Sequence, residues 1–354
     1  MTPDFAVFDG HNDFLLRLQR EPARREEIFL QRGASGHLDL PRMREGGFAG
    51  GLFAIFVPSP ATPGTPSLEE ITRNPPYDSA LPAALSPQAA QPVALQAAAQ
   101  MLWMERAAPD DFAICRNVAE IRAAMARGAI AGVMHMEGAE AIDPGLDALH
   151  VFHALGLRSL GPVWSRPTAF GHGVPFRFPG DPDTGPGLTP QGKALVRECN
   201  RLGILIDLSH LNGKGFDDVA RISEAPLVAT HSNVHALCPS PRNLTDRQLD
   251  RIAESGGMVG LNFATIFLRP DGRRAADCGL EPMLRHLDYL IGRLGEDHVG
   301  FGSDFDGCTV PDAIGDVTGL PHLISALQGH GFDKMLLDKL TCDNWVALLE
   351  RVIG

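Results

Sequence analysis

The chain of 354 residues is 44% hydrophobic and carries a formal net charge of −12, with a pI near 5.5. So many apolar side chains can form a large core, which excludes a disordered chain. The negative charge argues against nucleic acid and against an anionic membrane as partners, because their phosphates would be repelled, and it favours a small soluble substrate.

Eight apolar runs bounded by turn residues predict strands along the chain. They are residues 5–9, 48–57, 129–137, 157–164, 203–210, 226–231, 257–266 and 298–305. Helix-like patterns lie between them, and several end in the glycine that typically follows a helix C-terminus. Strands that alternate with amphipathic helices in this number predict an α/β fold, a (β/α)8 TIM barrel that spans residues 1–354 as a single domain.

Two connections are too long to be plain turns. Residues 58–92 contain nine prolines, and residues 165–190 are rich in glycine and proline. Such segments are restricted without being regular, which suits a wall or lid over an active site. We therefore expect long active-site loops at about 58–92 and 165–190.

The cysteines and the N-terminal segment bear on the compartment. The six cysteines are scattered without a C-x-x-C pair, which does not suit a disulfide framework. The first residues lack a basic segment followed by an apolar stretch, and no apolar run approaches the ~20 residues of a membrane span. We expect cytoplasmic residence.

Six polar side chains fall at the C-terminal ends of five predicted strands. They are His11, Asp13, Glu137, His210, His231 and Asp304. In a barrel these ends form one rim, which is where catalytic groups lie. Three imidazoles and three carboxylates are too many charges to leave unpaired, whereas divalent ions would neutralise the acids and hold the rings. The pattern predicts a metal site at this rim, with two ions rather than one.

Each of these residues also has a purely structural interpretation. A single histidine at a strand end is more often hydrogen-bonded than a ligand, and a strand-end aspartate often caps a helix. The joint pattern, not any one residue, favours the metal site. His135 shares the barrel-facing phase of Glu137, but a packed core histidine explains it better. Asp9 could orient a ligand or simply form buried hydrogen bonds.

Five short motifs together resemble the membrane (renal) dipeptidase family of the amidohydrolase superfamily. They are DGHND, MEG, DLSH, THSN followed by PRN, and GFGSDFDG, in that order from Phe8 almost to the C-terminus. The resemblance implies a binuclear zinc dipeptidase. It implies that His11 and Asp13 bind one zinc, that His210 and His231 bind the other, and that Glu137 bridges both. It also implies a homodimer.

The same resemblance implies roles for two further residues. Asp304 would be the general acid/base, and Arg242 in PRN would receive the substrate carboxylate. The expected reaction is hydrolysis of a dipeptide with a free C-terminal carboxylate by a metal-bridging hydroxide, with a D-configured C-terminal residue tolerated. The alternative for Arg242 is a surface arginine in a salt bridge.

The sequence departs from the family pattern at the end of the fourth predicted strand. Relatives carry a histidine there that donates to the tetrahedral oxyanion, whereas this chain has Trp164. The indole N–H of Trp164 or the imidazole of His172 in the following loop could supply the missing donor, or Trp164 could simply close the pocket wall. Glu140 also stands where many relatives have a histidine, which we interpret as a change around the ligands.

Two other functions fit the same residues. Another amidohydrolase, acting on an N-acyl amino acid or a lactam, would use the same metals with a different carboxylate anchor. A metal-binding protein could have lost catalysis together with the strand-four histidine. The presence of Asp304 and of all five expected ligands argues against that loss.

Overall fold

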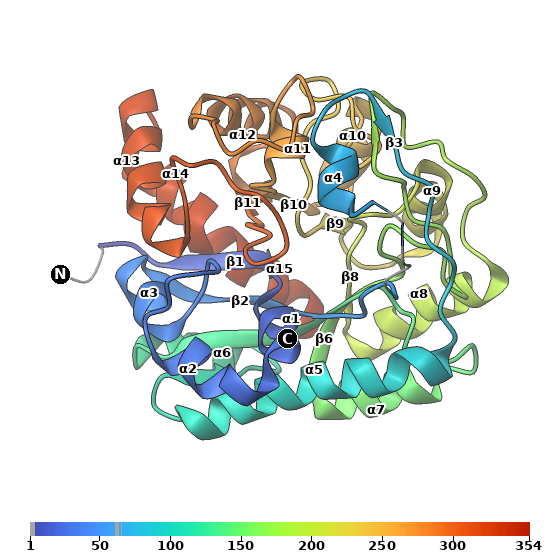
Figure 1. Cartoon of the computed structure of the whole chain (residues 1–354), viewed down its shortest axis with the longest axis horizontal. Helices are drawn as coiled ribbons and strands as arrows, with labels where there is room; N and C mark the ends of the chain where they lie inside the picture. The colour runs from blue at the N-terminus through green and yellow to red at the C-terminus, as the bar shows by residue number, and fades with distance from the viewer. Residues whose placement is uncertain (1–3, 61–63, 65) are drawn as a thin grey trace.

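A closed ring of parallel strands forms the centre of the computed structural model, which describes residues 4–60, 64 and 66–354 (Figure 1). Ladders join the strands in the orders β1-β2-β5-β6-β8 and β9-β10-β11. Parallel bridges from Asp207 to Val228 and from Asn12 to Phe305 close the two sheets into one barrel. The eight strands are β1 (Val7–Asn12), β2 (Phe48–Phe56), β5 (Ile130–Glu137), β6 (Leu157–Gly161), β8 (Leu205–Ile206), β9 (Val228–Ala229), β10 (Met258–Leu261) and β11 (Val299–Phe301). The predicted (β/α)8 fold is confirmed.

Most of these strands are shorter than the apolar runs predicted. Strands β8, β9 and β11 have only two or three residues each, so His210, His231 and Asp304 lie in turns beyond the strands and not at their ends. The backbone explains part of the difference, because His210 and Asp304 have positive φ angles of 67° and 60°. An extended strand cannot continue through such a conformation. Strand β1, in contrast, runs past its predicted end and includes His11.

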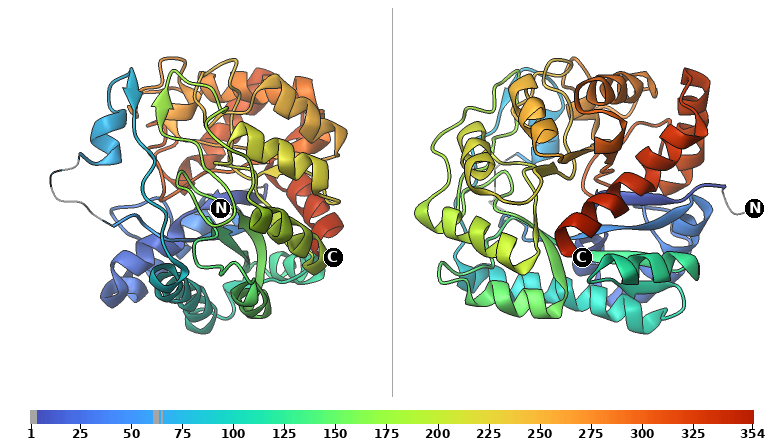
Figure 2. Two further views of the ribbon diagram at one scale, coloured as in Figure 1. Left: turned by 90° about the vertical axis from the view of Figure 1, so that its right-hand side faces the viewer. Right: turned by 180° about the vertical axis from the view of Figure 1, so that it is seen from behind.

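Helices cover the outside of the barrel (Figures 1 and 2). Strand β5 is buried along its whole length, as expected for a parallel sheet that is covered on both faces. The helices are α1 (Phe14–Arg20), α2 (Arg25–Leu30), α3 (Leu40–Glu45), α4 (Leu68–Thr72), α5 (Pro87–Ala107), α6 (Val118–Ala126), α7 (Asp147–Leu155), α8 (Pro190–Leu202), α9 (Gly213–Ile222), α10 (Asp246–Glu254), α11 (Thr265–Leu268), α12 (Glu281–Leu294), α13 (Leu320–His330), α14 (Lys334–Asp338) and α15 (Asn344–Ile353).

Apolar side chains fill the barrel interior towards the amino ends of the strands. One buried cluster combines Phe8 of β1, Val133 of β5 and Leu205 of β8 with Trp345 of α15. The indole of Trp345 donates to the carbonyl of Phe301 at 2.8 Å. Glycines in β1, β10 and β11 make room for this ring, since a Cβ at any of them would meet it. A rigid apolar plug therefore supports the polar end of the barrel.

The two long loops contain more regular structure than the sequence indicated. The first contains α4 and the start of α5, where Ser86 caps the helix and Pro87 occupies its first turn, a position that tolerates proline. Strands β3 (Tyr77–Asp78) and β7 (Arg177–Phe178) pair in antiparallel fashion and join one loop to the other (Figure 2, left). A further strand, β4 (Phe112–Ile114), adds to β5 outside the ring.

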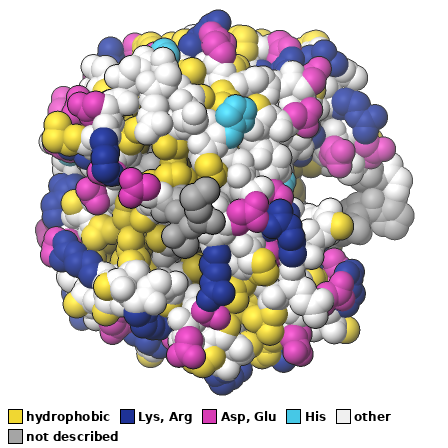
Figure 3. All heavy atoms as spheres, turned by 90° about the vertical axis from the view of Figure 1, so that its left-hand side faces the viewer, with side chains coloured by type: hydrophobic (Ala, Val, Ile, Leu, Met, Phe, Trp, Pro, Cys, Tyr) yellow, Lys and Arg dark blue, Asp and Glu magenta, His cyan; other side chains and the backbone are white. Residues whose placement is uncertain are grey.

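The surface carries charges of both signs. On the face drawn in Figure 3, Lys and Arg side chains are interspersed with Asp and Glu. This mixture does not provide the continuous basic field on which nucleic-acid phosphates bind. Within the described residues, none of the helices combines the length and the apolar character that crossing a membrane requires.

Candidate active site

Three histidines converge on one carboxylate inside the barrel. Oε1 of Glu137 lies 3.0 Å from Nε2 of His210, 3.4 Å from Nε2 of His231 and 3.9 Å from Nε2 of His11. The rings of His11 and His231 stack with their centroids 3.7 Å apart. All four side chains are buried. Ring nitrogens and carboxylate oxygens in this proximity are the donor types that zinc-class ions prefer.

Two aspartates stand beside His11. Oδ2 of Asp13, just past β1, lies 3.5 Å from Nε2 of His11. One donor atom each from His11, Asp13 and Asp304 lie within 4.8 Å of one another, and the same holds for His11, Glu137 and His231. Two donor groups suited to a metal therefore meet at His11.

The hydrogen bonding of these histidines also fits a metal. Both ring nitrogens of His11 and Nε2 of His231 are buried and have no hydrogen-bond partner among the described residues. Buried polar atoms are normally satisfied, and orphaned ones need an explanation. A cation bound by these nitrogens supplies one, so the residues fit a metal cofactor.

Burial sets the charges at this site. It raises the pKa of Glu137 well above its ordinary value, and it lowers the pKa values of His210 and His231 well below theirs. Burial alone would also lower the pKa of His11, but the charges of Glu137 and Asp13 outweigh it and raise that pKa to about 10. His210 and His231 are therefore neutral, as ligands must be, and the acids around His11 favour a positive charge there, which a bound cation would supply in place of the proton.

Hydroxyl groups form hydrogen bonds with the Nδ1 atoms of His210 and His231, on the side of each ring away from Glu137. Ser165 Oγ lies 2.9 Å from Nδ1 of His210, and Thr230 Oγ1 lies 2.8 Å from Nδ1 of His231. Thr230 in turn donates to Oδ2 of Asp207 at 2.6 Å. Such partners fix the ring orientation and leave Nε2 to face the centre. The sequence analysis did not identify these three residues. Only Asp207 had a usable signal, because it is the aspartate of the DLSH motif.

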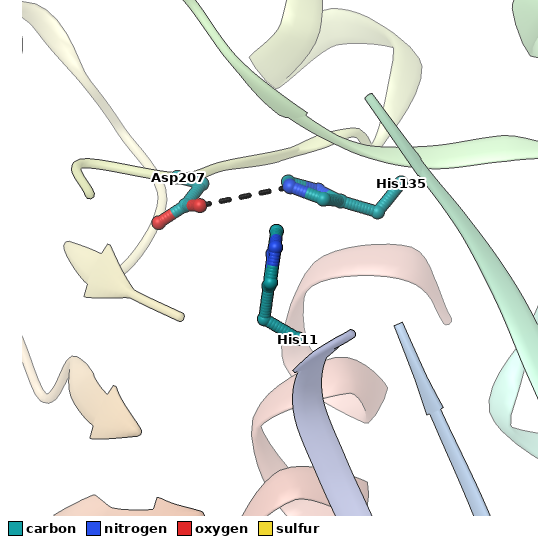
Figure 4. A group of neighbouring side chains, drawn as sticks. All are labelled: His11, His135 and Asp207. Carbon is teal, nitrogen blue, oxygen red and sulfur yellow. Dashed lines mark ion pairs between the residues drawn. The ribbon is translucent and has the colours of Figure 1, made fainter. Parts of the chain in front are cut away.

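His135 forms a third donor group with His11 and Asp207 (Figure 4). Its Nε2 lies 3.7 Å from Oδ2 of Asp207, its Nδ1 lies 2.8 Å from Ser159 Oγ, and its ring meets that of His11 edge-on. Burial lowers the pKa of His135 to about 4, so the ring is neutral. It packs directly beside the ligand candidates.

The turn after β11 is tied to β1. Asp304 donates its backbone N–H to the carbonyl of His11 at 2.9 Å, and its Oδ2 accepts from Asn262 at 3.0 Å. One residue earlier, Ser303 donates both its N–H and its hydroxyl to the Asp9 carboxylate at 2.7 Å. Asp9 therefore positions the segment that carries Asp304. The backbone of Asp304 is left-handed, and strain of this kind is retained at functional sites.

A cavity of about 460 Å³ opens onto this centre. Its polar lining includes Asp13, Glu137, His210 and Asp304, and aromatic rings including Trp164 form part of its apolar wall. The Trp164 ring centroid lies 5.9 Å from that of His210. A cavity of this size suits a small ligand.

His172, the other predicted oxyanion donor, has a different place. Its side chain is not among the described residues that line this cavity. Its backbone carbonyl accepts from the N–H of Asn212 at 3.2 Å, and the next residue bridges to Leu211, so the backbone of this loop is fixed. Although His172 lies between Gly171 and Gly173, backbone hydrogen bonds hold this loop in place.

Arg242 is buried beside the site. Its two terminal nitrogens donate to Ser232 Oγ and to the carbonyl of His231, both at 2.9 Å. Its Nε has no partner among the described residues, and its guanidinium lies 5.4 Å from the centroid of Phe267, a residue of the cavity wall. It is not the surface arginine that the sequence left as an alternative.

Glu140 forms a buried ion pair with Arg166. Nε and a terminal nitrogen of Arg166 donate to its Oε1 at 3.0 and 2.8 Å, and Arg166 also donates to the carbonyl of Val57 and to Ser59 Oγ. Glu140 thus anchors the loop after β2, and it does not contact the metal ligand candidates through any of these bonds.

A family model described as membrane dipeptidase (peptidase family M19) matches residues 1–353. The chain belongs to this family. A solved metallo peptidase from Rhodobacter sphaeroides, liganded with a phosphinate mimic of the dipeptide L-Ala-D-Ala, is 65% identical to this member of the family. The match covers 99% of this chain and 100% of that one, with a TM-score of 0.97.

Two further relatives are similar over two thirds of the chain or more. A solved dipeptidase AC, a metallo peptidase of family M19, is 66% identical over 99% of this chain and 100% of that chain, with a TM-score of 0.97. A protein from Klebsiella pneumoniae, described as lying in the pqqA 5′ region, is 52% identical over 68% of this chain and 88% of its own. The chain is a metallo-dipeptidase of family M19, a peptide hydrolase with a metal cofactor.

Proposed function

We propose that this enzyme hydrolyses dipeptides with a free C-terminal carboxylate, using two zinc ions. The observation that supports this most strongly is the position of Glu137, whose Oε1 lies within 3.9 Å of Nε2 of three histidines. The dipeptide mimic bound by the similar Rhodobacter sphaeroides enzyme supports the substrate class.

The family resemblance assigns the donors to two ions. His11 and Asp13 would hold one zinc, His210 and His231 the other, and Glu137, which lies near His210 and His231, would serve both. Bound there, divalent ions supply Lewis acidity, which polarises the scissile carbonyl and makes an attacking water acidic near neutral pH.

Asp304 would carry the proton. Burial and the nearby charge of Asp13 raise its pKa to about 6, so it exchanges a proton easily near neutral pH. Asn262 holds Oδ2, and Oδ1 is left to take a proton from the attacking water and deliver it to the leaving amine.

Arg242 would bind the terminal carboxylate. Its Nε is an unused buried donor, and Phe267 holds the guanidinium plane against the cavity wall. A charge-assisted bond from a buried guanidinium restricts substrates to those whose carboxylate lies close to the scissile bond. We also propose that a D-configured C-terminal residue is tolerated.

The test is a dipeptide library with L and D residues at each position, assayed before and after removal of metal and again after zinc is restored. Zinc-dependent release of both amino acids supports the proposal. Better turnover of N-acyl amino acids or lactams would replace it with the related amidohydrolase function. Bound zinc without hydrolysis of any of these would indicate lost catalysis.

A second experiment isolates Arg242. Arg242→Ala should raise KM for a free dipeptide, with a loss of roughly 2–5 kcal/mol in apparent binding, and should have little effect on the same dipeptide amidated at its C-terminus. Arg247→Ala, which removes an exposed arginine from the same segment, is the matched control. Equal losses for acid and amide would contradict the role.

A further inference from the structure

The catalytic cavity is lined by basic as well as acidic side chains. Asp13, Glu137 and Asp304 line it at the proposed metal site, and two arginines, Arg20 and Arg274, also line it. The chain as a whole is strongly acidic, with a formal net charge of −12. The two arginines therefore give this cavity positive charges that the composition of the chain as a whole does not lead one to expect.

The length of helix α1 sets the distance between Arg20 and the proposed zinc ligand Asp13. Asp13 precedes the helix, and Leu16 and Arg20 follow at the spacing that places side chains on one helix face. All three line the cavity. With a rise of ~1.5 Å per residue, the helix puts Arg20 roughly 10 Å from Asp13 along its axis. The charge of Arg20 is therefore beyond the reacting bond but within reach of a substrate side chain.

Arg274 lines the cavity from the segment between α11 and α12. Its Nε donates to Thr72 Oγ1 at 2.8 Å, and its backbone N–H donates to the carbonyl of Thr72 at 3.3 Å. No carboxylate among the described residues forms an ion pair with it. The side chain is half-buried, so its guanidinium is held in place and its terminal nitrogens remain available.

The charge of Arg274 acts on a neighbouring cysteine of the cavity wall. Burial raises the pKa of Cys308 well above its ordinary value, and the positive charge of Arg274 opposes that rise. Cys308 lines the cavity four residues after Asp304. Arg274 is therefore within electrostatic reach of the wall that adjoins Asp304.

We propose that the cavity selects dipeptides with an acidic side chain, whose carboxylate is bound by Arg274 with help from Arg20. This inference rests on the proposed function and names its substrate class. With zinc bound, the carboxylates at the centre are neutralised, and the two guanidinium groups attract a side-chain carboxylate by charge. The terminal carboxylate of the substrate goes to Arg242, a separate buried guanidinium beside the Phe267 ring, so the two anions are bound by different cations.

The experiment compares isosteric substrates. The kcat/KM values for Ala-Glu and Ala-Gln, and for Glu-Ala and Gln-Ala, are measured with the zinc-loaded enzyme. We expect the acidic member of at least one pair to be preferred roughly tenfold or more, and the preference to shrink when the salt concentration rises from about 50 mM to about 500 mM. The pair that shows the preference identifies which residue carries the acidic side chain.

Variants assign the preference to Arg274. Arg274→Gln should reduce the ratio of acidic to neutral kcat/KM to about one, and Arg274→Lys should keep part of it because the charge remains. Arg20→Gln should reduce the ratio less, since that side chain is exposed. Arg273→Gln removes the adjacent exposed arginine, which does not line the cavity, and should leave the ratio as in the wild type.

Two results would overturn the inference. A wild-type ratio near one, with good turnover of neutral dipeptides, would refute the acidic preference and leave the proposed function intact. Equal losses for the acidic and neutral substrates in both Arg274 variants would mean that Arg274 only anchors α4 through Thr72. Failure to hydrolyse any dipeptide would reject the proposed function, and this inference with it.

Discussion

Ser165 Oγ lies 2.9 Å from Nδ1 of His210, on a ring whose Nε2 lies 3.0 Å from Oε1 of Glu137. When Nε2 binds a metal, Nδ1 carries the ring proton and donates it to the serine oxygen. The residue directly after Trp164 thus selects the tautomer that a ligand requires. This contact connects the loop after β6 to the metal site.

Ser165→Ala should therefore weaken zinc binding at the His210 side by roughly 10- to 100-fold, the usual effect of losing a partner behind a ligand. Competition with a chelator of known affinity measures it. Ser159→Ala is the matched control, because it removes a buried hydroxyl from Nδ1 of His135, which is not a proposed ligand. Unchanged zinc affinity in Ser165→Ala would show that the serine only fills space.

Asp304→Asn separates chemistry from binding. It should lower kcat by roughly 10²–10⁴ while zinc content and KM stay close to those of the wild type, because it removes a proton carrier needed only during the reaction. The bond from Asn262 to Oδ2 can be kept by the amide oxygen, so the side chain should stay in place. Loss of zinc in this variant would instead make Asp304 a ligand.

Substitutions of Trp164 and His172 should have different effects on kcat, because of these two residues only Trp164 lines the cavity. Trp164→Phe keeps the bulk of a ring and removes the N–H, so it should lower kcat by roughly 10²–10³ if the indole donates to the oxyanion, as we expect. His172→Ala should change kcat less than about threefold. Steady-state kinetics of both variants with one good dipeptide measure these losses. A larger loss of kcat in His172→Ala than in Trp164→Phe would make His172 the donor.

His286 gives the fold a pH dependence away from the metal site. Its Nδ1 accepts from the backbone N–H of Val234 at 3.1 Å, its Nε2 lies 3.1 Å from the carbonyl of Leu268, and burial lowers its pKa from 6.5 to about 4. The unfolded chain therefore takes up the proton first as the pH falls below 6.5. The stability from the neutral ring is full above that pH and is lost as the pH falls towards 4.

Between about pH 7.5 and pH 5 this histidine should account for a loss of about 2 kcal/mol in the free energy of unfolding. His286→Gln, although less stable at neutral pH, should lose correspondingly less over the same interval in urea unfolding. His322→Gln changes an exposed histidine and should follow the wild type. Identical pH slopes for the wild type and His286→Gln would refute this prediction.

The sequence predicted the barrel because apolar runs alternate with amphipathic helices, and it predicted which residues would meet because parallel strands share one rim. His11 and Glu137 lie within their strands, where the period of two applies directly. His210 and Asp304 reach the site through left-handed turns, which no periodicity indicates. Their convergence was predicted, but their local geometry was not.

Contacts that depend on three-dimensional closure could not be predicted. No motif in the sequence marks Ser165 or Thr230, because their role depends on the position of the histidine rings that they contact in the folded chain. Arg274 reaches the cavity only because a segment far along the chain meets Thr72. Cytoplasmic residence and a homodimer depend on the cell and on a second chain, and they stay predictions, the latter open to sedimentation analysis.

Dipeptide hydrolysis by this enzyme should need two metal ions together in one site. Elemental analysis of the enzyme, with activity followed as zinc is added back to the metal-free protein, measures this requirement. Dipeptidase activity should reach its maximum at two zinc ions per chain. Full activity with one ion per chain, or with none, would contradict it.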